Sequence, residues 1–261
     1  MKKIVKNPLL ILAVGVLIVL GSSIGATKAA FVYKSEAEEV DFHTSNVRVA
    51  LLEGTDDSEE SSDMKDVTDD GILSFPGIPT EDVKIGNKYN ELVSIKNTSD
   101  KYNEYVRVTV KKYWVTECED GQIAKDTSLD PSLIKLDIVN DGSAKWIADT
   151  TDRTSEEEVY YLTSPVASGQ VVPLIRGITI SNKVVTAVET KAASDDEGNT
   201  ISGTIEDYYI YDGGSFYVDV KVDAVQTHNS ENAIRGAWGV EAKCDAADDG
   251  NIISINGVSA R

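Results

Sequence analysis

The chain contains few of the residues that most catalytic sites need. It has only two histidines, His43 and His228. Neither belongs to a paired-histidine helix motif, and a zinc site built by this chain would need both of them together with carboxylates. The sequence also lacks a nucleophile-elbow, phosphate-binding or dinucleotide-binding motif. The composition therefore predicts a protein that is not an enzyme and carries no cofactor.

Basic residues are also scarce. The chain has 25 lysines and arginines against 44 aspartates and glutamates, which gives a formal net charge of −19. Removal of residues 1–29 would remove four lysines and no acid, so 25 − 4 = 21 basic residues would face 44 acidic ones and the net charge would be −23. A polyanion of this size repels phosphate backbones and anionic lipid headgroups. The charge predicts no nucleic-acid partner and no electrostatic attachment to a membrane.

Long apolar runs are confined to the N-terminal region. Lys2, Lys3 and Lys6 precede the apolar run Leu9–Leu20, which is followed by small residues. A basic start, a short apolar run and small residues are typical of an export signal peptide. An uncleaved anchor is the alternative, because residues 8–26 could just cross a bilayer. We expect a cleaved signal and a secreted protein that does not stay inserted in the membrane.

The small residues also predict where the signal is cut. Cleavage after Ala29 places Thr27 and Ala29 at the two small-residue positions of the peptidase site, and the mature chain then begins at Ala30. No proline-rich or glycine/serine-rich linker divides the rest of the chain. We therefore expect a signal peptide at residues 1–29 and a single extracellular domain at residues 30–261, with a flexible N-terminal arm at about residues 30–41.

Strand patterns recur along this domain, whereas helix patterns are rare. Apolar and polar residues alternate in Phe216–Asp223 and again in Val106–Lys111, which is typical of strands with one buried face. We expect an all-β fold, an antiparallel β-sandwich of jelly-roll type with long acidic loops. Further segments rich in β-branched and aromatic residues predict strands at 47–52, 89–96, 133–139, 158–163, 170–180, 183–190 and 204–211.

One short helix is predicted near the C-terminus. After Asn229, an apolar stripe of four residues recurs at spacings of three and four, and we expect it to pack on the sandwich. We likewise expect the tryptophans to lie in the core, because aromatic residues of alternating strands are usually buried. The stripe consists of Ala233, Ile234, Ala237 and Trp238.

Acidic residues gather between the strands, above all in Glu53–Asp70, Asp195–Asn199 and Asp245–Asn251. Carboxylates at this density can collect calcium, which takes six to eight oxygen ligands. None of the three segments has EF-hand spacing. Solvated loops are therefore the favoured interpretation, and calcium binding is the alternative.

Cys118 and Cys244 are the only cysteines. Both belong to the predicted exported part, where oxidation is permitted, so we expect a disulfide between them. Two free thiols are the alternative, because the sequence does not place the two Cα atoms within bonding distance.

Several short motifs together resemble the family of exported proteins typified by TasA and camelysin. The resemblance rests on three features. They are the signal junction with the strand that follows it, an asparagine before a Tyr-Val-Arg-Val strand, and a closing strand with a helix. They are Thr27–Phe31, Val47–Glu53, Asn97, Tyr105–Val108, Trp146, Tyr160-Tyr161, Val222–Asn229, Ala233 and Ala237–Gly239.

The resemblance implies a jelly-roll subunit of extracellular fibres, in a biofilm matrix or a cell-surface layer. Its partners would be other copies of the chain and other exported matrix proteins. An exposed sheet edge is a template for a further strand, and a segment freed by signal cleavage can supply one. The candidate donor is residues 40–52, whose apolar side chains are Phe42, Val47, Val49 and Leu51. The alternative is that this segment is the first strand of its own sheet.

Two other functions remain as alternatives. Camelysin-type members of the family are described as cell-surface metalloproteases, which two isolated histidines support poorly. A non-enzymatic adhesin that binds a carbohydrate or a host surface would also fit a secreted sandwich with three tryptophans and eleven tyrosines.

Overall fold

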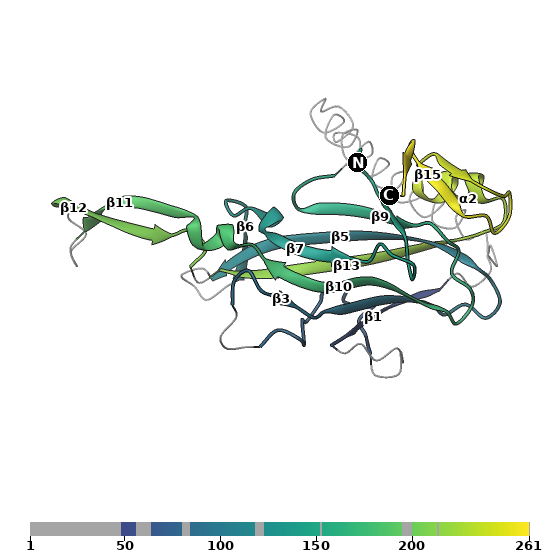
Figure 1. Ribbon diagram of the computed structural model, residues 1–261, viewed down its shortest axis with the longest axis horizontal. Coiled ribbons are helices and arrows are strands. Elements are labelled where there is room, and N and C mark those ends of the chain that lie inside the picture. The colour runs from purple at the N-terminus through teal and green to yellow at the C-terminus, as the bar shows by residue number, and fades with distance from the viewer. Residues whose placement is uncertain are drawn as a thin grey trace, which may run out of the picture. The chain divides into compact units, whose positions relative to one another are not determined.

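Two antiparallel sheets form the body of the domain, and a helix with three short strands covers part of one of them (Figure 1). In this computed structural model the described residues are 48–55, 64–79, 84–117, 123–151, 153–194, 200–212 and 214–260. They belong to one unit, Ser45–Arg261. The expected all-β antiparallel sandwich is confirmed.

The first sheet has the strand order β2-β1-β4-β10-β3, and β7 also pairs with β10. Ile178 of β10 pairs with Tyr89 on one side and with Leu136 on the other, so β3 and β4 share one edge of β10 and β7 lies on the opposite edge. The strands are β1 (Val49–Gly54), β2 (Lys65–Asp66), β3 (Lys88–Tyr89), β4 (Leu92–Asn97), β7 (Ile134–Ile138) and β10 (Val171–Ile180).

The second sheet has the strand order β13-β5-β9-β8, and β6 also pairs with β5. β5 and β13 are its longest strands and pair from Glu104↔Gln226 to Val115↔Ser215. Because the side chains of a strand alternate between its faces, one face presents the predicted valines to the first sheet. The strands are β5 (Glu104–Glu117), β6 (Ile123–Asp126), β8 (Trp146–Ala148), β9 (Glu157–Leu162) and β13 (Ser215–Gln226).

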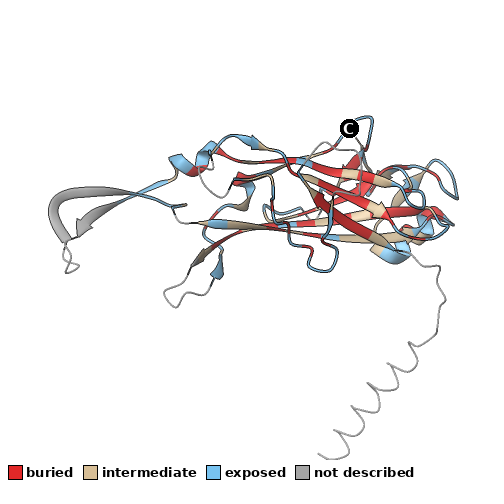
Figure 2. Ribbon diagram, turned by 90° about the horizontal axis from the view of Figure 1, so that it is seen from below, coloured by how far each residue is buried: buried red, intermediate tan, exposed pale blue. Residues whose placement is uncertain are grey.

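The main core lies between these sheets (Figure 2). Val106, Val108 and Val110 of β5 are fully buried there, and β4 and β10 supply facing residues. Trp114 and Trp146 are only 3% and 4% exposed, as expected for core aromatics. The short helix η3 (Pro131–Leu133) precedes β7, and Trp114 Nε1 donates a hydrogen bond of 2.9 Å to the carbonyl of Asp130 at the start of η3.

A second core lies on the outer face of the second sheet. Helix α2 (Ser230–Trp238) and the small sheet β14 (Ala242–Cys244), β15 (Ile252–Ile255) and β16 (Val258–Ser259) pack there. The predicted helix is confirmed, and Ile234 of its apolar stripe is fully buried. Ala233 and Trp238 are half-buried, whereas Ala237 is exposed, so the prediction that the whole stripe packs on the sandwich is wrong at Ala237. The members of this core are Tyr105, Ile147, Tyr161, Ile234, Ile252 and Ile255.

A two-stranded hairpin, β11 (Val188–Ser194) and β12 (Thr200–Tyr209), extends beyond the end of the sandwich (Figure 1). The prediction of a strand at 183–190 is wrong in its first half, because Asn182–Thr186 forms the short helix η4. Ser181 caps η4 by accepting a hydrogen bond from the backbone N–H of Lys183, and serine at such a position favours a helix start.

Candidate functional site

The sandwich is incompletely closed where the edge strands β1 and β13 approach each other. A groove of about 770 Å³ lies between them. Arg48–Ala50 and Thr98 line one wall, Val222–Ala224 lines the other, and Asp66, Thr68 and Asp69 complete it. Arg48, the first residue that the structure describes, lines this groove.

The outer edge of β13 has unpaired backbone groups beside the groove. Val218 accepts a hydrogen bond from Leu73 N, and Val220 donates one to the carbonyl of Gly71, so these two residues direct their backbone groups away from β5. Backbone groups of a strand alternate between its two sides, so Val222 and Ala224 point the same way. Within the described part of the chain, no residue pairs with Val222 or Ala224 on that side.

The facing edge of β1 is open over a shorter stretch. The carbonyl of Arg48 accepts a hydrogen bond from Thr98 N and so points towards β4. Because backbone groups of a strand alternate between its two sides, those of Val49 point away from β4, and among the described residues nothing pairs with them. The backbone groups of Leu51 also point away from β4, but they are paired: its N–H donates to Thr68 Oγ1 at 2.8 Å and its carbonyl accepts from Val67 N at 2.9 Å. The groove thus has open backbone groups on both sides, at Val222 and Ala224 of β13 and at Val49 of β1, which is a geometry that accepts an extended chain.

The groove is predominantly acidic. Hydrogen bonds from the hydroxyl and N–H of Thr68 lower the pKa of Asp66. Burial opposes ionisation of Asp223, but its hydrogen bond and ion pair with Arg107 at 2.7 Å, together with Lys221, hold the pKa of that carboxyl below its usual value. Both groups are therefore negatively charged at neutral pH.

A buried polar network fixes the groove at Arg48. Glu104 is fully buried, and its Oε1 accepts a hydrogen bond of 3.0 Å from the backbone N–H of Arg48. Burial raises the pKa of Glu104, whose other oxygen has no hydrogen-bond partner among the described residues. Asn97, also fully buried, donates to the carbonyls of Tyr102 and Val166 at 2.8 Å. The network holds the 97–104 connection and the start of β1 in place.

The prediction that Val49 and Leu51 donate a strand to another subunit is wrong. Both lie in β1, where they pair with Asn97 and Ile95 of the same chain, and Leu51 is 1% exposed. The alternative, a first strand of the protein's own sheet, holds for Val49–Gly54. The other predicted donor residues, Phe42 and Val47, and the predicted cleavage residues Thr27, Ala29 and Ala30 lie outside the described residues.

The predicted disulfide is also wrong, because Cys244 is a free thiol. Cys244 packs in the second core near Tyr105, at the beginning of β5. Cys118 lies outside the described residues and follows Glu117, the last residue of β5, in the chain. At about 3.3 Å per residue, Tyr105 and Glu117 are roughly 40 Å apart, far beyond the distance that a disulfide can bridge.

Acidic residues of the Asp245–Asn251 loop have structural partners. Asp245 Oδ1 accepts from Asn251 N at 2.7 Å, Asp248 Oδ1 accepts from Asn229 N at 2.7 Å, and Asp249 Oδ1 accepts from Thr227 and Asn103. These bonds tie the loop after β14 to the start of α2 and to Asn103, the residue before β5. In the parts of the chain that the structure describes, no three His, Cys, Asp or Glu side chains are grouped as a metal site.

The two histidines are not brought together by the described structure. His228 is 80% exposed, and its Nδ1 lies 2.9 Å from Asp248 Oδ1. His43 lies outside the described residues, as do Asp195–Asn199 and residues 56–63 of the predicted acidic loops. In the residues covered by the structure, no helix combines the length and the apolar character needed to span a membrane.

Sequence reasoning did not find the groove itself, because its walls come from β1, β13 and the 64–70 segment, which are far apart in the sequence. The alternation in Phe216–Asp223 predicted β13 but not that β13 would be an edge strand. No family model, curated protein or solved structure matches this chain.

Proposed function

We propose that the protein is a secreted structural subunit of extracellular or cell-surface fibres, of the jelly-roll type implied by its resemblance to the TasA and camelysin family. In this proposal the N-terminal segment of one subunit adds as a strand to the open edge of the next. The donor comes from residues 30–47, with Phe42 and Val47 as apolar side chains. β1 is excluded as donor because it is part of the subunit's own sheet.

One observation carries the proposal: Val222 and Ala224 direct backbone groups into a groove and have no partner among the described residues. An unpaired edge strand is a ready template for another chain, and main-chain hydrogen bonds give such an added strand much of its affinity. The donor leaves one subunit and enters another, so the contact is heterologous and can repeat without closing. Repetition gives a filament.

The edge is tested by placing a proline in it. Ala224→Pro removes an outward N–H and adds a ring on the side where a strand would dock, while the backbone bonds of Asp223 and Val225 to β5 stay available. We expect the mature Ala224→Pro protein to fold but to form no filaments in electron microscopy. Ala224→Val, which keeps the N–H, is the matched control and should form them.

The donor is tested by deletion of residues 30–41 from the mature protein. We expect the circular dichroism spectrum of the folded domain to be kept and filaments to be lost. The proposal fails if the complete mature protein stays monomeric in light scattering from about pH 4 to pH 8 and from low to high salt, also with other exported matrix proteins present. It also fails if Ala224→Pro forms the same filaments as the control.

A further inference from the structure

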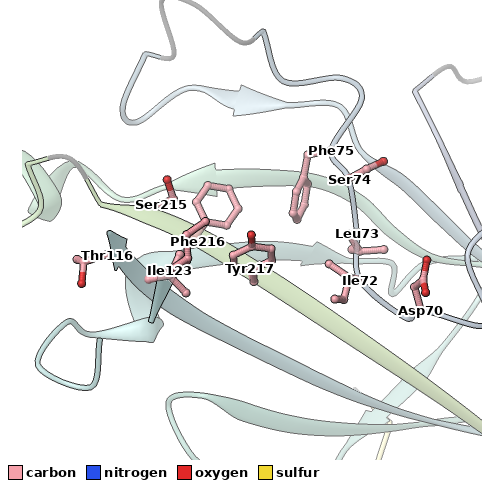
Figure 3. A pocket seen from close by; sticks show the side chains of 11 residues that line it. Asp70, Ile72, Leu73, Ser74, Phe75, Thr116, Ile123, Ser215, Phe216 and Tyr217 are labelled. Carbon is pink, nitrogen blue, oxygen red and sulfur yellow. The ribbon is translucent and has the colours of Figure 1, made fainter. Parts of the chain in front are cut away.

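A short segment, Gly71–Phe75, lies along the middle of the β13 edge (Figure 3). We call it the strap. Gly71, Leu73 and Phe75 are buried, whereas Ile72 and Ser74 are exposed, so the strap has the alternation of a strand with one buried face. It pairs with β13 through only two backbone hydrogen bonds, Leu73 N to Val218 O at 3.0 Å and Val220 N to Gly71 O at 2.7 Å.

The strap limits the length of edge that a partner can use. With the strap in place, the open stretch beside the groove is Val222–Ala224, roughly 10 Å long at about 3.3 Å per residue. A typical strand has about five or six residues. Without the strap, the edge would run from Phe216 to Ala224, roughly 30 Å. Only this longer edge gives an added strand the hydrogen bonds of an ordinary sheet.

The strap is anchored at one end by side chains. The ring of Phe75 contacts that of Phe216 edge-on, with centroids 5.3 Å apart. The carboxylate of Glu53 accepts hydrogen bonds from Ser74 N at 2.6 Å, Ser74 Oγ at 2.7 Å and Phe75 N at 2.9 Å. These contacts hold the strap in the isolated subunit.

The strap's backbone is also under strain at Phe75, and at its other end it takes a conformation that suits only glycine. Phe75 has a φ of 51°, a left-handed conformation that a bulky residue rarely adopts. Gly71 has a φ of 66°, and a Cβ added there would lie 2.9 Å from the carbonyl oxygen of Val220. The strap is therefore held by few backbone bonds against a conformational cost, which favours its release as a unit.

Space for apolar side chains lies along the strap, on the side of Phe216. A groove of about 630 Å³ opens beside Phe216, lined by Ile72, Phe75, Ile123 and Tyr217 among others (Figure 3). Ile72 and Ile123 are 43% and 62% exposed, which is unusual for isoleucine. When the strap is displaced, an added strand with apolar side chains on its inner face would replace the contacts of Leu73 and Phe75.

We propose that the docking surface of this subunit is the whole outer edge of β13, Phe216–Ala224, and that the strap covers its middle until a strand from a second copy displaces it. The proposal rests on the function proposed above. The occupant is a segment of residues 30–47 of that second copy. Fully extended, this stretch would reach roughly 60 Å, enough to cover the edge and still connect to its own domain at Arg48.

The first test locks the strap. Ile72 and Asp219 form an antiparallel bridge flanked by the two hydrogen bonds, so they are a non-hydrogen-bonded pair, in which Cα atoms are closest. The variant carries Ile72→Cys and Asp219→Cys in a background with Cys118→Ser and Cys244→Ser. We expect the oxidised protein to assemble at least about tenfold more slowly than the same protein with reductant, which is its matched control.

The second test loosens the strap. Gly71→Ala introduces the clash with Val220 and an unfavourable φ, so the Leu73 and Val220 amides should exchange with solvent at least about tenfold faster and assembly should start sooner. Gly142→Ala is the control, because an added Cβ there meets nothing within 4 Å. Its exchange and assembly should equal those of the unchanged protein.

The outcomes separate this inference from the proposed function. If the oxidised lock assembles as fast as its reduced form, the strap inference is overturned and the fibre function stands. The strap inference is also overturned if the amides of Leu73 and Val220 exchange with solvent only when the core amides of Val108 and Val110 do, because the strap would then open only when the whole domain unfolds. If the unchanged protein forms no filaments, the fibre function has failed and the strap inference falls with it.

Discussion

Two adjacent glutamates of β9 pair with two adjacent lysines of β5, and the two pairs differ in exposure. Lys111 Nζ lies 3.1 Å from Glu157, and these side chains are 48% and 42% exposed. Lys112 Nζ lies 3.4 Å from Glu158, and these are 8% and 9% exposed. Exposed ion pairs contribute little to stability, whereas removal of one partner from a buried pair leaves an uncompensated charge.

We therefore expect Glu158→Gln to lower the free energy of unfolding by about 3 kcal/mol, because the Lys112 ammonium stays buried without a counter-charge. Glu157→Gln, its neighbour in sequence, should leave the urea-unfolding midpoint close to that of the unchanged protein. Burial alone would raise the pKa of Glu158, but Lys112, Tyr160 and Arg153 hold it below its usual value. The stabilisation is thus present above about pH 4.5 and is lost as the pH falls through the lowered pKa. Equal midpoints for the two variants would contradict this.

The pKa of Glu91 is shifted in the opposite direction to that of Glu158. It is fully buried, and neither carboxyl oxygen has a hydrogen-bond partner among the described residues. Burial, and then the nearby carboxyl of Glu53, raise the pKa of Glu91 to about 9. Glu91 is therefore uncharged at neutral pH, beside the Glu53 side chain that accepts the strap's hydrogen bonds.

This difference predicts a stability that declines towards alkaline pH. The folded protein keeps the Glu91 proton up to about pH 9, whereas the unfolded chain releases it near pH 4.5, so stability falls as the pH rises between these values. Glu91→Gln removes the titrating group, and we expect a flatter curve of urea-unfolding midpoints between about pH 5 and pH 9. Glu157→Gln should keep the slope of the unchanged protein. An unchanged slope in Glu91→Gln would show that Glu91 is not the source.

At the scale of elements, local sequence patterns predicted the long strands and the helix. Alternation in Phe216–Asp223 and Val106–Lys111 marked β13 and β5, and the spacing of Ile234 and Trp238 marked α2. Strands of two to four residues, such as β6, β8 and β14, carry too few side chains for a recognisable period. The strap was missed for a similar reason, because Ile72 interrupts the apolar alternation of Leu73 and Phe75.

The disulfide prediction failed because pairing depends on distances that composition does not contain. Export and an even number of cysteines favoured a bridge, but β5 separates its first residues, near Cys244, from its last residue, Glu117. Likewise, the donor prediction for Val49 and Leu51 rested on apolar alternation, which is the same for a donated strand and for an internal one. Only the pairing with β4 distinguishes them.

We expect both cysteines to be alkylated when the purified protein is denatured without reductant. In the native protein Cys244 should react slowly, because burial and then the carboxylate of Glu231 raise the pKa of its thiol and reduce the thiolate fraction. Mass spectrometry of the digested protein measures both. Recovery of a linked Cys118–Cys244 peptide pair would contradict the prediction.

At the scale of the whole molecule, charge opposes the proposed assembly. The predicted mature chain has a net charge of −23, from 21 basic and 44 acidic residues. Of these acidic residues, Asp66, Asp69 and Asp223 line the groove, and the donor region 30–47 also has more acidic than basic residues. Like charges repel over about 10 Å at 0.1 M salt and less at higher salt. Assembly is therefore a balance between backbone pairing and repulsion.

The balance makes a directional prediction. Filaments of the mature protein should form faster as salt rises from about 10 mM to 300 mM, and faster as the pH falls towards the sequence pI of about 4.4, because screening and protonation both reduce repulsion. Asp69→Asn, in the groove, should speed assembly at low salt and weaken the salt dependence. Asp212→Asn changes the net charge equally but precedes the other end of β13, so its effect should be smaller. Light scattering gives the rates, and electron microscopy separates filaments from amorphous precipitate. Equal effects of the two variants would show that total charge, and not the groove, controls assembly.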